Sequence, residues 1–258
     1  MADPVAPVFK LGLKVAGPKP QLSFGTYFKA AKLPPVPTRF GRPWLVQTWG
    51  VFGNDIAGDC VWAGAAHETM MFSADVGSSV LFDTQEVLSD YSAVTGYVYG
   101  DDSTDQGTDM TEAAAYRQKT GIIDADGQRH KIDVYASLRN GDLGQLKLAA
   151  YLLGAVGVGV NFPDTAMDQF NNGDVWDIEA SSKNAGGHYI PCIGRNSVGN
   201  FLFVTWGRLQ AATPAWVRQY MNGGIAYLSR ERLSARGLSP QGFNLAQLND
   251  DFAQITKS

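Results

Sequence analysis

The pattern of apolar and polar positions divides the chain into a helix-rich part followed by a strand-rich part. A polar, glycine-bearing loop at residues 53–59 leads into Cys60, and the apolar positions then continue without a proline or glycine cluster until Gly77. Such a dense apolar run predicts a buried helix of about four turns that begins at Cys60. Two further helices are expected over Asp83–Tyr91 and Thr108–Gly121, because each range starts with residues that cap helices.

After residue 130, short apolar runs are separated by turn residues. Val156–Phe162, Gly187–Gly194 and Phe201–Trp206 have the length and composition of buried strands, and the last two are joined by a short turn. The other predicted elements are a strand over Ile132–Tyr135, a helix over Asp142–Leu153, a strand over Gly224–Ser229 and an amphipathic helix over Phe243–Ile255. We therefore expect an α+β fold with a helical lobe, a β-rich lobe and a cleft between them.

Proline is frequent in the first 37 residues, which we expect to form an extended arm with one helical turn near Tyr27–Ala31. The predicted boundaries place the helical lobe at 38–129, the β-rich lobe at 130–236 and a C-terminal helix at 237–258. Together these parts are expected to make one domain.

Composition and charge exclude several functional classes. The 258 residues are 45% hydrophobic, and 21 Lys and Arg residues against 25 Asp and Glu residues give a net charge of −4 without a basic cluster, which argues against nucleic-acid binding. No apolar run is long enough for a transmembrane helix, and no signal-peptide pattern is present. With only two cysteines, the chain is expected to be cytoplasmic. No metal-binding or nucleotide-binding motif occurs, so neither a metal nor a cofactor is expected.

Cys60 is the first candidate for chemistry because it occupies the first turn of the predicted helix. Unpaired N–H groups and the helix dipole favour a thiolate there, although a small buried core residue is the alternative interpretation. Three histidines could act as its base. His67 is two turns further along the same helix and is expected to be a packed core residue, and His130 is expected in a solvated loop. His188 opens a buried strand in the other lobe and is the best placed.

Five segments, in this order, resemble the papain-like cysteine peptidases. Asn54–Cys60 resembles the segment with the oxyanion glutamine and the nucleophile, Gly187–Gly194 the strand with the base, and Phe203–Gly207 the Asn-Ser-Trp-Gly segment. The other two are Phe82–Tyr91 and Gln106–Ile122. The resemblance runs from about residue 37 to residue 229 and implies a two-lobe papain-like fold.

The resemblance also implies a mechanism. Cys60 would attack an amide carbonyl, His188 would carry the thiol proton, and Asn54 together with the Cys60 N–H would stabilise the oxyanion. Gly107 would pair with the backbone of a peptide substrate. The expected partner is thus a peptide or protein, with no nucleic acid and no membrane involved.

Three departures from the family's pattern bear on catalysis. Asn54 is one methylene shorter than the family's glutamine, and Val61 separates the cysteine from Trp62. Val204 stands where the family has the asparagine that orients the imidazole, and Thr205 is expected to face the other way. Valine cannot hold the histidine, so the sequence leaves open whether catalysis is retained.

Two functions therefore stay open: a cysteine peptidase or amidase, and an attenuated papain-fold binding or structural protein, for example a phage assembly component that is part of the virion. Capture of the thioester by an amine, which is acyl transfer, is a third. The arm is shorter than the family's inhibitory prosegment, so regulation is expected elsewhere. Substrate preference and oligomeric state are not determined by the sequence.

Overall fold

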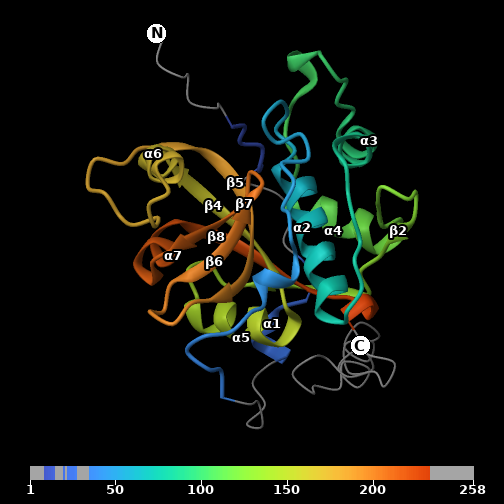
Figure 1. The fold of residues 1–258 in the computed structure, drawn as a ribbon. Coiled ribbons are helices and arrows are strands. Elements are labelled where there is room, and N and C mark those ends of the chain that lie inside the picture. Colours follow the sequence, from blue (N-terminus) through green and yellow to red (C-terminus); the bar gives the residue numbers. More distant parts are fainter. Residues whose placement is uncertain (1–8, 15–19, 21, 28–34, 233–258) are drawn as a thin grey trace.

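A computed structural model describes residues 9–14, 20, 22–27 and 35–232. Within these residues, an antiparallel six-stranded sheet has the order β3-β8-β4-β5-β6-β7 and forms the β-rich part of the molecule (Figure 1). Its strands are Val134–Leu138 (β3), Val156–Pro163 (β4), Asn184–Arg195 (β5), Phe201–Thr205 (β6), Arg208–Ala212 (β7) and Met221–Leu228 (β8).

The α-helices are Phe24–Tyr27 (α1), Cys60–Asp75 (α2), Thr84–Thr95 (α3), Met110–Lys119 (α4), Leu143–Leu153 (α5), Thr165–Asn172 (α6) and Pro214–Tyr220 (α7). Short 3-10 turns occupy Pro43–Leu45 (η1), Asp102–Thr104 (η2) and Arg230–Arg232 (η3), and a small hairpin joins Ile122–Ile123 (β1) to Arg129–His130 (β2).

Helix α2 lies at the centre, with the sheet on one side and α3 and α4 on the other (Figure 1). Its residues 60–73 are all buried, as the continuous apolar run predicts. Asp59 is the N-cap residue, but its side chain makes no capping hydrogen bond. Buried apolar residues form two clusters, one around α2 and one around α5–α7 on the opposite face of the sheet. Strand β5 supplies side chains to both clusters because its successive residues alternate between the faces.

The α+β architecture predicted from the sequence is confirmed. The Cys60 helix and the helix now called α5 begin within one residue of their predicted starts, whereas α3 continues beyond its predicted end at Tyr91 as far as Thr95. Strand β3 starts at Val134, two residues later than predicted. Helices α6 and α7 were not predicted. Two further expectations fall largely outside the described residues, namely the helical turn at 27–31 and the C-terminal helix at 237–258.

The predicted domain boundaries stay a prediction. In the part of the chain that the structure describes, no helix is both long enough and apolar enough to cross a membrane.

Candidate active site

The Cys60 side chain lies at the start of α2, where that helix meets strand β5. The thiol is a free cysteine and is only 2% exposed. Burial raises the pKa of the Cys60 thiol to about 12, and backbone N–H groups of Tyr189 and Gly12 offset part of that increase. Tyr189 directly follows His188 in β5, so the candidate nucleophile lies next to the backbone that carries the candidate base.

The candidate oxyanion residue, Asn54, is buried in the loop that leads to α2. Its side-chain Nδ2 donates to the carbonyl oxygen of Ala57 at 3.2 Å, so the amide is engaged within its own loop. Asp59, between that loop and Cys60, is fully buried, and burial raises the pKa of its carboxyl well above its usual value.

His188 is held by a residue that the sequence comparison discounted. Its Nε2 lies 2.8 Å from Oγ1 of Thr205, and its ring stacks on Trp206 with ring centroids 4.4 Å apart. Val204 points to the other face of the sheet, into the cluster around α2. The expectation that Thr205 faces away was therefore wrong. Alternation along β6 does separate positions 204 and 205, but His188 lies on the face that Thr205 shares.

The Thr205 contact is compatible with two tautomers of the imidazole, and one of them suits a base. When Nε2–H donates to Thr205, Nδ1 keeps the lone pair that a general base needs. No described residue makes a hydrogen bond to His188 Nδ1, although this atom is buried. Burial lowers the pKa of His188 to about 3, so the ring is neutral at pH 7. A neutral, oriented imidazole with one unpaired nitrogen can accept a proton.

The N-terminal arm lies across the start of α2, alongside β5, and pairs with the helical side of the molecule (Figure 1). The Lys10 N–H donates to the backbone oxygen of Asn54 at 3.0 Å. The carbonyl of Gly12 accepts from Thr108 at 2.8 Å, and the Lys14 N–H donates back to the carbonyl of Thr108 at 3.0 Å. These bonds are of the kind that an extended peptide makes along an exposed edge.

The same segment also pairs with the sheet side. The Leu13 N–H donates to the carbonyl of Gly187 at 3.0 Å, immediately before His188, and Trp206 Nε1 donates to the Lys10 carbonyl at 3.4 Å. The Phe9 ring stacks on Trp206 at 5.0 Å. Residues 9–14 therefore bridge the two sides, with Gly12 at Cys60 and Leu13 bonded to the residue before His188. The expectation that regulation lies elsewhere, made from the arm's length, did not foresee this contact.

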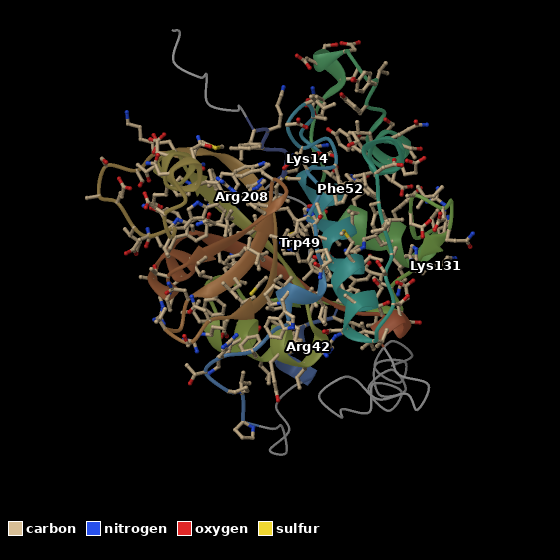
Figure 2. All side chains as sticks on the ribbon, viewed as in Figure 1. Lys14, Arg42, Trp49, Phe52, Lys131 and Arg208 are labelled. Atoms are coloured by element: carbon tan, nitrogen blue, oxygen red, sulfur yellow. The ribbon has the colours of Figure 1, made fainter. Side chains whose placement is uncertain are left out.

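Gly12 is the arm residue nearest to the thiol. A Cβ atom at this position would lie 1.7 Å from the carbonyl oxygen of Gly58, so only glycine fits. Its N–H is the group that faces the sulfur. A thiolate attacks a carbonyl carbon and not an N–H. Gly12 therefore lies at the candidate nucleophile with a group that the sulfur cannot cleave. Lys14, exposed and labelled in Figure 2, is the arm residue two positions beyond Gly12.

Gly107, predicted to pair with substrate, lies in contact with the arm but does not supply the pairing. Its N–H donates to the hydroxyl of Tyr91 at 2.9 Å, and a Cβ atom there would lie 2.1 Å from the carbonyl oxygen of Gly12. The backbone pairing comes from Thr108, one residue later. The expectation that Gly107 pairs with a peptide substrate stays a prediction.

The other two histidines are outside this site. His67 is buried on α2, its Nε2 lies 2.8 Å from the carbonyl oxygen of Gly50, and its ring packs against Trp49 and Phe52, both labelled in Figure 2. Burial lowers its pKa to about 4, as expected for a packed core residue.

His130 was expected in a solvated loop, and this was wrong. Its two ring nitrogens lie 2.8 Å from an Asp124 carboxylate oxygen and 2.7 Å from a Glu231 carboxylate oxygen. Burial lowers the pKa of His130, but the two carboxylates outweigh it and raise the pKa above its usual value.

The chain resembles known proteins in structure but not in sequence. No family model matches the chain, and no curated protein matches it by sequence. Solved structures do match. Xylellain, a cysteine protease from Xylella fastidiosa, is 11% identical with a TM-score of 0.59, and the match covers 89% of this chain and 99% of xylellain.

Two further matches come from other kingdoms. Digestive procathepsin L2 proteinase from Tenebrio molitor is 15% identical with a TM-score of 0.58, covering 85% of this chain and 78% of the other. The Carica candamarcensis cysteine protease CMS1MS2, solved in complex with E-64, is 14% identical with a TM-score of 0.54, covering 75% of this chain and 99% of the other. Identities this low establish the fold and nothing finer. The chain has the papain-like cysteine protease fold.

Proposed function

We propose that the protein is a cysteine peptidase or amidase in which Cys60 is the nucleophile and His188 is the base, and that residues 9–14 hold it in a latent state. The observation that carries the proposal is the state of His188: Thr205 engages Nε2, and Nδ1 is left buried and unpaired among the described residues. His67 also has one paired and one unpaired nitrogen, so what distinguishes His188 is its place: it directly precedes Tyr189, whose backbone N–H lies against the Cys60 sulfur.

The chemistry follows from these positions. The Cys60 thiol gives its proton to His188 Nδ1, and the sulfur forms a bond to the substrate carbonyl carbon. The Cys60 N–H, together with the Asn54 amide once it turns from Ala57, stabilises the oxyanion. The carbon–nitrogen bond then breaks, and the departing amine takes the proton from the imidazolium. Water cleaves the thioester and returns the thiol. His188 would be held throughout by Thr205, which takes the part of the family's asparagine.

In this proposal the arm contributes to the burial that raises the pKa of the thiol, although the Gly12 N–H itself lowers that pKa. With Gly12 over Cys60, the sulfur is removed from water, and burial is the largest cause of its high pKa. Release of the arm would return water to the thiol and open the Thr108 edge to a peptide substrate. Several of the matched structures are proforms or precursors by name, which is compatible with a latent form here.

Turnover of a protein substrate tests the proposal. Gly12→Val should displace the arm, because a Cβ atom at this position collides with the Gly58 carbonyl. We expect this variant to hydrolyse fluorescein-labelled casein, and the added change Cys60→Ala to abolish the hydrolysis. Lys14→Ala is the matched control, since it changes an exposed arm side chain and keeps the arm's backbone bonds. No Cys60-dependent hydrolysis in Gly12→Val would overturn the peptidase proposal.

A second candidate function is a papain-fold binding protein without turnover. It is favoured by the engagement of the Asn54 amide with Ala57, which leaves the oxyanion without that donor in this conformation. In that case Cys60→Ser would leave the biological phenotype unchanged. Acyl transfer uses the same thioester and is distinguished by adding a primary amine and analysing the product mass.

A further inference from the structure

Tyr189 connects the two halves of the candidate catalytic pair. It follows His188 in β5, and alternation turns its side chain to the opposite face, toward α2. Its backbone N–H lies against the Cys60 sulfur. Tyr189 thus contacts the candidate nucleophile through its backbone and is covalently linked to the candidate base. Its side chain packs against α2, the helix that carries Cys60.

The Tyr189 ring occupies a slot made by two glycines on different elements. A Cβ atom on Gly64, one turn after Cys60 in α2, would lie 2.5 Å from ring carbon Cδ1. A Cβ atom on Gly157 of β4 would lie 1.8 Å from the Tyr189 hydroxyl oxygen. Contacts this short cannot occur, so the absence of both side chains is what lets the ring lie between helix and sheet. The helix α2 and strand β5 are therefore held at a spacing set by the thickness of one phenol ring.

A buried charged group holds the far end of the ring. The Tyr189 hydroxyl donates to Glu68 Oε1 at 2.7 Å and lies 2.9 Å from the Tyr227 hydroxyl. The second Glu68 oxygen accepts from Arg117 Nη1 at 2.5 Å, and the Arg117 guanidinium lies over the Tyr227 ring. All four side chains are buried.

Glu68 and Cys60 are both on α2, eight residues and about 12 Å apart. The hydroxyl of Tyr189 is therefore fixed to the helix that carries the thiol, and its backbone is fixed to His188. A hydrogen bond to a buried, charge-paired carboxylate is among the stronger bonds available to a tyrosine. Tyr189 therefore contacts α2 at two positions, Cys60 through its backbone and Glu68 through its hydroxyl. These two contacts fix how far His188 lies from the helix.

We propose that Tyr189 is a positioning residue that sets the distance between Cys60 and His188, with the Gly64 slot and the Glu68 carboxylate as its two anchors. This inference rests on the proposed function. The competing interpretation is that the cluster only adds core stability. The two differ in what a small displacement does: a positioning residue changes the reactivity of Cys60, whereas a packing residue changes only the unfolding temperature.

The test measures the rate of Cys60 alkylation by iodoacetamide from pH 5 to pH 10 in the full chain carrying Gly12→Val. The parent should react faster than an ordinary thiol at pH 6–7, because a neighbouring imidazole lowers the thiol pKa below about 8.5. Gly64→Ala should push the Tyr189 ring out of its slot. We expect its rate at pH 7 to fall roughly tenfold or more and its profile to become that of an ordinary cysteine.

Two further variants keep the result interpretable. Tyr189→Phe keeps the ring and loses the bond to Glu68, so it should shift the profile in the same direction by less. Leu152→Ala, in α5 on the other face of the sheet, is the control for lost core packing. It should lower the unfolding temperature and leave the pH profile at the parent's.

The outcomes separate the two levels of the proposal. A parent that alkylates like an ordinary thiol contradicts the proposed function itself. A parent with a lowered thiol pKa, together with Gly64→Ala and Tyr189→Phe variants that keep its profile, contradicts the positioning role alone. If Gly64→Ala does not fold, the Tyr189→Phe profile decides between positioning and packing.

Discussion

The two sides of the candidate site are in different states. On the sheet side, His188 is hydrogen-bonded to Thr205, stacked on Trp206 and kept neutral by burial, which lowers its pKa to about 3. On the helix side, the Cys60 thiol has a raised pKa and Asn54 is engaged with its own loop. The arm crosses both sides, but Gly12 faces the thiol. Burial holds both groups neutral, raising the pKa of the thiol and lowering the pKa of the imidazole, so the two sides differ in orientation: His188 contacts Thr205, whereas the Asn54 amide is turned into its own loop.

The largest loss of activity is expected from replacing Thr205, the residue that contacts His188. Thr205→Val is close in volume and removes the oxygen that engages His188 Nε2, so the imidazole loses its orienting partner. Loss of such a partner in a catalytic triad costs about 10⁴ in rate, and we expect a fall of roughly two to four orders of magnitude in casein hydrolysis by Gly12→Val.

Thr205→Asn, which restores a hydrogen-bonding group, should recover much of the lost activity. Val204→Ala, on the opposite face, serves as the control and should keep it. Equal activity of Thr205→Val and the parent would mean that the sheet side is not organised by this contact.

Weakening the arm should change the helix side by a smaller amount. Phe9→Ala removes the ring that stacks on Trp206 and contacts Phe170 edge-on. Each aromatic contact contributes about 0.5–1.5 kcal/mol, so the arm should open more often and Cys60 should be alkylated roughly tenfold faster. The rate of iodoacetamide modification of the full chain measures this, with Lys14→Ala as the reference. An unchanged rate would show that the ring does not hold the arm closed.

The third prediction concerns stability at acid pH and compares the histidines of the two sides. The pKa of His67 is about 4 in the folded state, against about 6.5 in an unfolded chain. Between pH 6.5 and pH 4, His67 therefore binds a proton in the unfolded chain but not in the folded chain. The stability contributed by neutral His67 is complete above pH 6.5 and is lost as the pH falls toward 4.

The free energy of unfolding should therefore fall less steeply in His67→Gln between pH 6.5 and pH 4. The change in slope should correspond to at most about one fewer proton taken up on unfolding. Urea unfolding at a series of pH values measures it. His188, with a pKa of about 3, should leave a residual slope of the same sign. An unchanged slope in the variant would indicate that His67 is not kept neutral by burial.

Much of the helix side could be predicted from the sequence, because its signals are local. The apolar run after Cys60 identifies a buried helix, and Asp83 and Asp142 cap α3 and α5 where a polar residue precedes an apolar pattern. Helix α7 carried a readable signal as well, namely Thr213 as N-cap followed by a proline at the first helical position. The short apolar pattern after that proline concealed it.

The parts that could not be predicted depend on non-local geometry. Which face of β6 carries the partner of His188 depends on the register with β5, which shifts between Cys192 and Gly194. The contacts of the arm are made mainly by backbone N–H and carbonyl groups, which every residue carries, so no residue pattern announces them. The slot for Tyr189 depends on glycines from a helix and a strand far apart in the sequence. Gly12 was the one local signal, since a glycine often marks a close backbone approach.

The central claim is that Cys60 and His188 form a catalytic pair covered by residues 9–14. Its most direct test is the formation of a covalent adduct with E-64, the compound present in the matched Carica structure. Intact-mass analysis of the full chain would follow the rate of adduct formation in the native protein, in Gly12→Val and in Gly12→Val with Cys60→Ala. We predict a single adduct on Cys60 that forms roughly tenfold or more faster in Gly12→Val than in the native protein, and none in the Cys60→Ala variant. An arm-displaced protein that forms no adduct at Cys60 near neutral pH would contradict the pair.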